Sequence, residues 1–184
     1  MNRISSATIF VLVILLMRYL MSSSNKEITV NDDGVLVFKM NKVYGIIGVL
    51  GIITAGIIGI IASLGTVKTI VDFLMVLFLV LLFICLCFPL ILVSRNQKIV
   101  ASDERILFYS MTGKPKEILW KDINKVKFNK VSLELKLMTS STSIKLHRHL
   151  VGFNKFVELM EKNVNKEIYS DAIITLQSVN KRYS

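Results

Sequence analysis

The sequence predicts an α+β membrane protein, in which a transmembrane helical hairpin leads into a small β-domain capped by a C-terminal helix. Three observations support this prediction: two long apolar segments, an alternation of apolar and polar residues after Asn96, and a helical apolar period from Phe153. Hydrophobic residues make up 53% of the chain, above the roughly 45–50% of a soluble domain. They are concentrated in a few segments, as in membrane proteins.

The two apolar segments have the length of membrane-spanning helices. Residues 44–65 carry no charge, and residues 70–93 carry only Asp72, near their start. At about 1.5 Å per residue each segment would span roughly 33–36 Å, enough for a hydrocarbon core of about 30 Å. We therefore expect a transmembrane hairpin over residues 43–93, with Lys68 paired to Asp72 at its outer end.

Small residues recur every four positions along the first apolar segment, at Gly51, Ala55, Gly59 and Ser63. In lipid, such a repeat lets two helix backbones approach closely, so it predicts the face that packs on the second helix. Cys85 and Cys87 lie in the second segment without redox-pair or zinc-site spacing. We interpret them as lipid-buried thiols.

Residues 1–21 allow two interpretations. Arg3 precedes an apolar run of signal-peptide length, with a weak cleavage site near Ser22 and Ser24. Alternatively, residues 4–21 form a short membrane helix or signal anchor. The second interpretation is favoured, because a cleaved signal would leave the lysine-containing residues 22–43 outside while the later basic domain is inside.

Residues 22–42 predict a juxtamembrane β-hairpin. Ile28 and Val30 lead into the turn-forming run Asn-Asp-Asp-Gly at residues 31–34, and apolar residues 35–38 lead out. A lone two-stranded hairpin is only marginally stable in water. We expect this one to pack on the C-terminal domain or on the membrane surface.

Positive charge is concentrated after the second apolar segment. From residue 94 onward there are 17 Lys and Arg against 9 Asp and Glu, a net charge of +8 out of +10 for the whole chain. Basic segments next to membrane helices favour the cytoplasmic side and meet anionic lipid head groups there. We expect a multi-pass protein of the cell membrane with a cytoplasmic C-terminal domain. Nucleic acid is not an expected partner, because no recognition helix or RNA-binding motif is present.

Residues 94–164 predict about six short antiparallel strands on a meander, followed by one helix. The clearest alternation predicts a single unbroken strand through Val131, Leu133, Leu135 and Leu137. From Phe153 the apolar period becomes helical. Residues 165–184 predict a second helix, a C-terminal tail.

The order of these elements is similar to that of a known family. Residues 99–106 follow the hairpin directly, and one turn later a strand ending in Trp120 continues as Lys-Asp-Ile-Asn-Lys-Val to Val126. These features resemble the membrane-anchored pleckstrin-homology-like (PH-like) proteins of Gram-positive bacteria, over residues 43–163. The resemblance implies a PH-like β-barrel capped by a helix. Members of this group are mostly uncharacterised, and some look linked to envelope stress or resistance to antimicrobial peptides.

The motif that contributes to the resemblance also has a structural interpretation. Trp120, Ile123 and Val126 recur at three-residue intervals, which places them on one side of a tight turn over the core. Asp122 is positioned to hydrogen-bond the turn backbone. In PH domains that bind phosphoinositides, the loop between the first two strands is basic. The corresponding residues 102–104 are Ser-Asp-Glu, so phosphoinositide binding is not expected.

The basic residues nearest the membrane segments are the candidates for contact with anionic lipid: Arg95, Lys98, Lys114, Lys116 and Lys121. Each lysine or arginine near such a surface contributes about 1 kcal/mol. Further lysines follow at positions 125, 127 and 130. The alternative for all of them is an ordinary solvated surface. His147 and His149 would share one strand face, but no third ligand is placed beside them, and we expect no metal site.

No residue set predicts catalysis. The chain lacks a Ser/His/Asp or Cys/His arrangement and a phosphate-binding loop, so neither an enzyme nor a cofactor is expected. The expected function is a membrane-surface scaffold or protein-interaction module, with a membrane protein or a second copy of the chain as partner. Two alternatives remain: an anionic-lipid-binding module, or a small transporter or channel accessory subunit. The last is weakened because the long segments offer only Thr54 and Ser63 to line a path.

Overall fold

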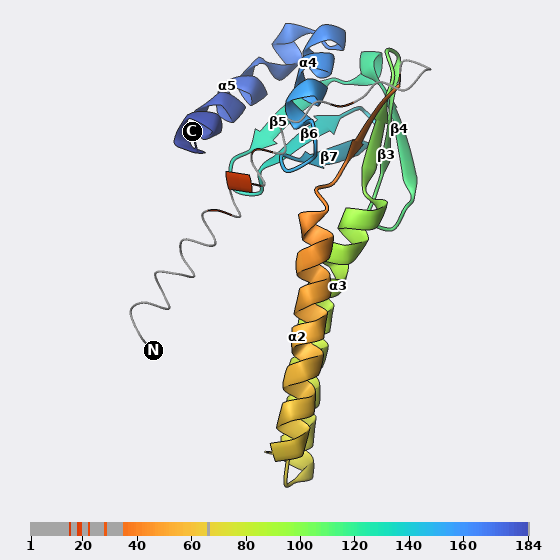
Figure 1. The fold of residues 1–184 in the computed structure, drawn as a ribbon. Helices are drawn as coiled ribbons and strands as arrows, with labels where there is room; N and C mark the ends of the chain where they lie inside the picture. The colour runs from red at the N-terminus through yellow and green to blue at the C-terminus, as the bar shows by residue number, and fades with distance from the viewer. Residues whose placement is uncertain are drawn as a thin grey trace. The chain divides into compact units, whose positions relative to one another are not determined.

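A computed structural model of the chain describes residues 35–65 and 67–183, together with Leu15, Arg18, Tyr19, Ser22 and Ile28. The predicted N-terminal membrane helix or signal anchor, and the first strand of the predicted 22–42 hairpin, fall almost entirely outside the described residues. The chain divides into two units (Figure 1). One is a helical unit of residues 42–97 and 110–114, and the other is a β-domain made of the remaining described residues.

The helical unit is a hairpin of helix α2 (Val43–Gly65) and helix α3 (Ile70–Asn96). Both helices are long and apolar enough to cross a membrane. No residue of α3 is buried, although almost all of its side chains are apolar. A core helix of a soluble protein would bury such side chains, so these surfaces fit a lipid environment better than water.

Helix α3 begins with a capping box. Thr69 Oγ1 accepts a hydrogen bond from the backbone N–H of Asp72 at 3.2 Å, and Asp72 Oδ2 accepts one from the backbone N–H of Thr69 at 3.0 Å. Asp72 Oδ2 also accepts from the backbone N–H of Lys68 at 3.2 Å. The predicted ion pair with the Lys68 side chain is therefore wrong, because the short carboxylate is already held by donors at the start of the helix.

Small residues line the contact between α2 and α3. Gly48 and Ala55 are the buried residues of α2, and a Cβ atom on Gly51 would collide with Cys87 Sγ. A Cβ atom on Gly59 would lie 3.0 Å from Val80 Cγ2. The structure thus places three of the four predicted packing residues, Gly51, Ala55 and Gly59, against α3. Ser63 is exposed instead, and its hydroxyl donates to the carbonyl of Gly59 at 2.8 Å.

We expect the substitution Gly48→Leu to force the two helices apart. A Cβ atom at this position would lie 2.8 Å from the backbone oxygen of Cys87, which cannot move without shifting α3. Overpacking of this kind costs about 1–3 kcal/mol, measurable as a lower midpoint of SDS-induced unfolding in mixed micelles. Gly56→Leu is the matched control, because a Cβ atom there meets nothing within 4 Å. Equal midpoints for the two variants would contradict the packing described.

The β-domain contains a four-stranded antiparallel sheet in the order β1-β2-β3-β4. Its strands are β1 (Leu36–Lys39), β2 (Lys98–Ala101), β3 (Arg105–Tyr109) and β4 (Pro115–Leu119). Strand β1 comes from the segment before the hairpin, yet it pairs with β2, with Leu36 opposite Ala101 and Lys39 opposite Lys98. The helical hairpin is thus an insertion between two neighbouring strands of one sheet.

This insertion changes the comparison with phosphoinositide-binding PH domains. The connection between the first two strands is the α2–α3 hairpin itself, and the Ser-Asp-Glu segment at residues 102–104 joins β2 to β3 instead. The prediction that residues 102–104 form the loop between the first two strands is therefore wrong, because β1 pairs with β2 across the hairpin and no local sequence pattern indicates this pairing.

A second antiparallel sheet has the order β5-β6-β7. It is formed by β5 (Lys125–Asn129), β6 (Glu134–Met138) and β7 (Ser143–His147). Strand β6 begins three residues later than predicted. Val131 is 93% exposed and Leu133 has a φ of 53°, and both lie in a turn. Asn129 Oδ1 accepts hydrogen bonds from the backbone N–H groups of Val131 and Ser132, which stabilises this turn over a longer strand.

Two C-terminal helices complete the β-domain, α4 (Phe153–Asn163) and α5 (Lys166–Tyr183). Helix α4 buries Phe153, Phe156 and Met160 completely, as the helical period predicts. The Phe156 ring packs edge-on against Phe38 of β1, with centroids 5.4 Å apart. Helix α5 contributes Ala172, Leu176 and Val179 to the same apolar core. One core therefore joins the strand before the hairpin to both helices at the end of the chain.

The predicted α+β class with a helical hairpin is confirmed, together with antiparallel strands and a terminal helix. A closed barrel is not confirmed, because the named strands form two separate sheets. Within the described chain, one isolated antiparallel bridge, between Met40 and Leu150, joins the segments that follow β1 and β7.

Candidate functional site

The tryptophan motif connects two parts of the β-domain through hydrogen bonds. Trp120 begins a short 3-10 helix, η2 (Trp120–Asp122), and is buried. Its indole Nε1–H donates to the backbone oxygen of Ser102 at 2.9 Å, and its backbone N–H donates to the carbonyl of Glu104 at 3.2 Å. These bonds tie η2 to the β2–β3 turn. Ile123 and Val126 are also buried. Asp122 is exposed, and within the described chain its carboxylate accepts no hydrogen bond from the turn backbone.

Two of the five candidate lipid-contacting residues belong to the helical unit. Arg95 is exposed in the last turn of α3. Lys114 is exposed in the β3–β4 turn, and this turn is held beside the end of α3 by a hydrogen bond from Asn96 Nδ2 to the carbonyl of Met111, at 2.8 Å. Arg95 and Lys114 thus both lie where the apolar helix ends.

The other three candidates belong to the β-domain and do not share one end of its sheet. Lys98 begins β2, and its Nζ lies 4.5 Å from the ring centroid of Tyr109. Lys116 is opposite Phe108, near the same end. Lys121 lies in η2, which contacts the opposite end of the four-stranded sheet at the β2–β3 turn. The structure therefore does not bring Lys121 together with Lys98 and Lys116.

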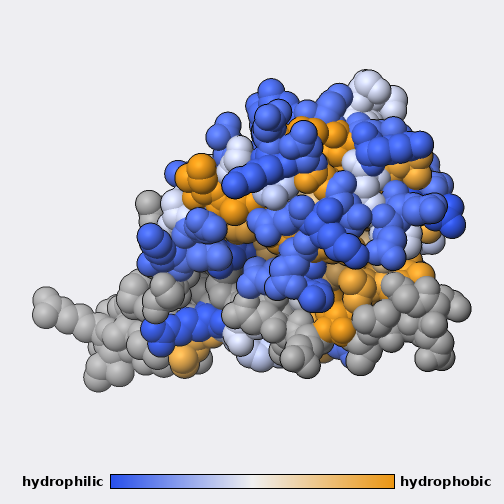
Figure 2. Space-filling view, turned by 90° about the horizontal axis from the view of Figure 1, so that it is seen from above, coloured by the Kyte–Doolittle hydropathy of each residue, from blue (hydrophilic) through white to orange (hydrophobic). Residues whose placement is uncertain are grey.

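Three lysines of the second sheet form a further cationic group, whose alignment was not predicted from the sequence. Lys127 of β5 is directly opposite Lys136 of β6, which is directly opposite Lys145 of β7. We call these three residues the lysine row. Hydrophilic residues also dominate the face shown in Figure 2, where separate hydrophobic patches interrupt them. The alternation of apolar and polar residues in each strand predicts that the lysines of the row point outward. That they lie opposite one another follows only from the register of the three strands.

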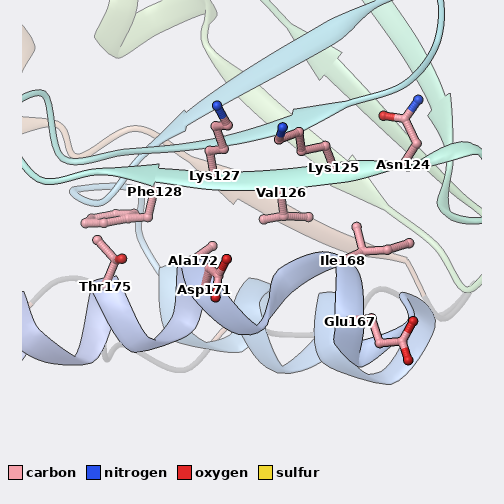
Figure 3. A pocket seen from close by; sticks show the side chains of 10 residues that line it. All are labelled: Asn124, Lys125, Val126, Lys127, Phe128, Glu167, Ile168, Asp171, Ala172 and Thr175. Atoms are coloured by element: carbon pink, nitrogen blue, oxygen red, sulfur yellow. The ribbon is translucent and has the colours of Figure 1, made fainter.

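A groove of about 470 Å³ lies between β5 and α5 (Figure 3). Val126 and Phe128 point from β5 toward α5, on which Ile168, Ala172 and Thr175 line the same groove. Lys125 and Lys127 point to the other side of β5. Val126, Phe128 and Ala172 are buried, so the groove is a shallow opening along a packed contact and not a deep ligand cavity.

The two histidines adjoin each other, although His149 lies in the turn after β7 and not on the strand. Their ring centroids are 4.6 Å apart, and the backbone N–H of His149 donates to Nδ1 of His147 at 3.2 Å. Burial, together with the positive charges of His147 and Arg148, lowers the pKa of His149 to about 4. Burial also lowers the pKa of His147, and Glu134 partly opposes that shift. Within the described chain, no group of three or more His, Cys, Asp or Glu side chains is placed to hold a metal ion.

The low pKa of His149 makes the β-domain sensitive to acid. The folded state binds the proton more weakly than the unfolded state, whose His pKa is about 6.5, so stability falls as the pH falls from 7 toward 4. We expect a loss of about 1–2 kcal/mol between pH 7 and pH 5, allowing for partial exposure of the imidazole pair. Urea unfolding in neutral micelles, followed by the fluorescence of Trp120, measures it. His149→Gln should flatten this pH dependence, and an unchanged slope would refute the assignment.

Comparisons with known proteins give no family for this chain, since no protein-family model, curated protein or solved structure matches it. The resemblance to membrane-anchored PH-like proteins therefore stays a prediction.

Proposed function

We propose that this protein is a multi-pass membrane protein whose hairpin anchors a PH-like β-domain, and that the β-domain acts as a scaffold or protein-interaction module at the cytoplasmic membrane surface. The main support is the insertion of two apolar helices between the paired strands β1 and β2. Both ends of the hairpin enter the same sheet, so the domain has two short covalent connections to the anchor. Such a domain stays attached to the bilayer, and a scaffold at the membrane surface needs this permanent attachment.

The strand arrangement also supports a PH-like domain. Apart from the α2–α3 hairpin inserted after β1, seven short strands in sheets of four and three precede helix α4 along the chain. A run of six or seven short strands closed by a helix is what the resemblance implies. The cytoplasmic placement is supported by the excess of positive charge after α3, since such charge favours the inner side.

Reporter fusions test the proposed topology. Fusions at Ser24 and Ser184 should report the cytoplasm, and a fusion at Val67, between the two helices, should report the outside. A cytoplasmic signal at Val67 would overturn the spanning hairpin. Pull-down of the full-length protein from solubilised membranes then tests the scaffold role, for which a stoichiometric protein partner is expected.

Contact with anionic lipid is a second candidate function, favoured by Arg95 and Lys114 at the end of α3. Lys114 in nanodiscs should become less reactive toward an amine-labelling reagent when anionic lipid replaces neutral lipid. Lys121, at the other end of the sheet, serves as the internal control. Equal protection of both lysines would argue against a local contact.

A transporter or channel role gains no support from α2. Its threonine and serine hydroxyl groups are bonded within the helix: Thr54 donates to the carbonyl of Leu50 and Ser63 to the carbonyl of Gly59, each at 2.8 Å. Hydroxyl groups bonded in this way satisfy the helix itself and offer less to a passing solute.

A further inference from the structure

The outer face of the β5-β6-β7 sheet carries an unusual alignment of like charges. Lys127, Lys136 and Lys145 are direct cross-strand neighbours on three adjacent strands. Neighbouring strands lie about 4.8 Å apart, so the three side chains start close together. Lys127 and Lys145 are exposed and Lys136 is half-buried. The apolar residues of the same strands, such as Leu135 and Leu146, point into the core.

This alignment is electrostatically unfavourable in the protein alone. Like charges directly opposite each other on a sheet repel. The described part of the chain gives the row one acidic partner, Glu134, whose Oε2 lies 3.9 Å from Lys145 Nζ. The same oxygen accepts a hydrogen bond from Ser132 Oγ at 3.1 Å. No ion pair to Lys127 or Lys136 is found among the residues described, so an added anion would relieve the repulsion between them.

The row borders a hollow of about 500 Å³. Its lining contains four lysines (the row and Lys130) and one glutamate, which gives a net charge of +3. Figure 3 shows Lys127 on the side of β5 opposite α5, so this helix does not cover the row at β5. A hollow with several ammonium groups on one side suits a compact ligand that carries several negative charges.

We infer that the lysine row binds a soluble ligand with two linked phosphate groups, such as a diphosphate or a diphosphate ester. In a diphosphate ester, the terminal phosphate carries about −1.5 to −2 charges at pH 7 and the ester-linked phosphate adds one more, so the total approaches the +3 of the lining. Inorganic diphosphate, which has two terminal phosphate groups, carries a similar total charge. A typical anionic lipid head group carries a single negative charge and matches the hollow less well. The inference does not depend on the scaffold role proposed above.

Binding of pyrophosphate to the full-length protein in neutral detergent tests this site. Calorimetry at low salt should show saturable binding to one site per chain. The triple variant K127Q/K136Q/K145Q should raise Kd at least tenfold. The control K155Q/K162Q/K166Q removes the same charge from exposed lysines of α4 and α5 and should change Kd less than twofold. Equal weakening by both variants, or binding that does not saturate, would overturn the site.

Amine-reactive footprinting separates the ligand sources and does not depend on any variant. Pyrophosphate should protect Lys127, Lys136 and Lys145 in neutral detergent, while Lys155 and Lys166 stay reactive. Protection of the row only in nanodiscs that contain anionic lipid, and not by pyrophosphate, would assign the row to the membrane surface and overturn the proposal. If the triple variant does not show the Trp120 fluorescence of the folded state, the single variant K136Q replaces it, with an expected three- to tenfold weakening.

Discussion

Excision of the helical hairpin is expected to leave a folded β-domain that is soluble without detergent. Lys39 and Lys98 are the last paired residues of the β1–β2 ladder, so an extension of this ladder by one residue would place Met40 opposite Gln97. Replacing residues 41–96 with Asn-Gly would close β1 and β2 with a two-residue turn of the type that suits a hairpin. The variant starts at residue 22, which removes the apolar N-terminal segment as well.

The measurement is size-exclusion chromatography without detergent, followed by urea unfolding monitored through Trp120, the single tryptophan of the chain. A cooperative transition is expected. The matched control carries Phe38→Asp in the same variant. Phe38 is fully buried in β1, and an unpaired charge at this position should prevent folding. If the excised protein aggregates while its circular dichroism shows no strand content, the hairpin is needed for folding and the two-unit description fails.

The hairpin and the alternating strands are predictable from the sequence because they depend on local patterns. A charge-free run long enough to span lipid has few other interpretations, and period-two alternation in 125–128 or 143–147 marks a strand directly. The helical period from Phe153 likewise predicts the buried face of α4. These elements require no knowledge of their partners.

The features that were missed depend on contacts between distant segments. The pairing of Leu36 with Ala101 crosses the whole hairpin, and nothing in either strand indicates it. The lysine row depends on the length of the β5–β6 turn. The alternation in the sequence predicts one unbroken strand from Val131, and this makes the turn too short. Moving the start of β6 to Glu134 sets the register that brings Lys127 opposite Lys136. A cation site on a sheet face is therefore predictable only once the turns are correct.

Truncation of Phe156 should remove a large part of the stability of the β-domain. Its side chain is fully buried, packs edge-on against Phe38 at 5.4 Å, and lies 5.8 Å from Trp120. Phe156→Ala is expected to cost about 3–5 kcal/mol, against a total of about 5–15 kcal/mol for a typical domain. Urea unfolding of the full-length protein in neutral micelles, followed by circular dichroism, measures this loss. Ile174→Ala on α5 is the control: Ile174 is 65% exposed and its truncation should change stability by less than about 0.5 kcal/mol.

A double-mutant cycle with Phe38→Ala extends this test to the connection between the ends of the chain. Phe38 precedes the hairpin and Phe156 follows both sheets, so their contact joins the two ends of the domain in one core. An aromatic pair of this geometry is expected to show a coupling of about 0.5–1.5 kcal/mol. Because β1 is covalently continuous with α2, such coupling would make the fold of the β-domain depend on the segment that enters the anchor. A coupling of zero would mean that β1 is an independent addition, and the anchor would then hold the domain only through β2.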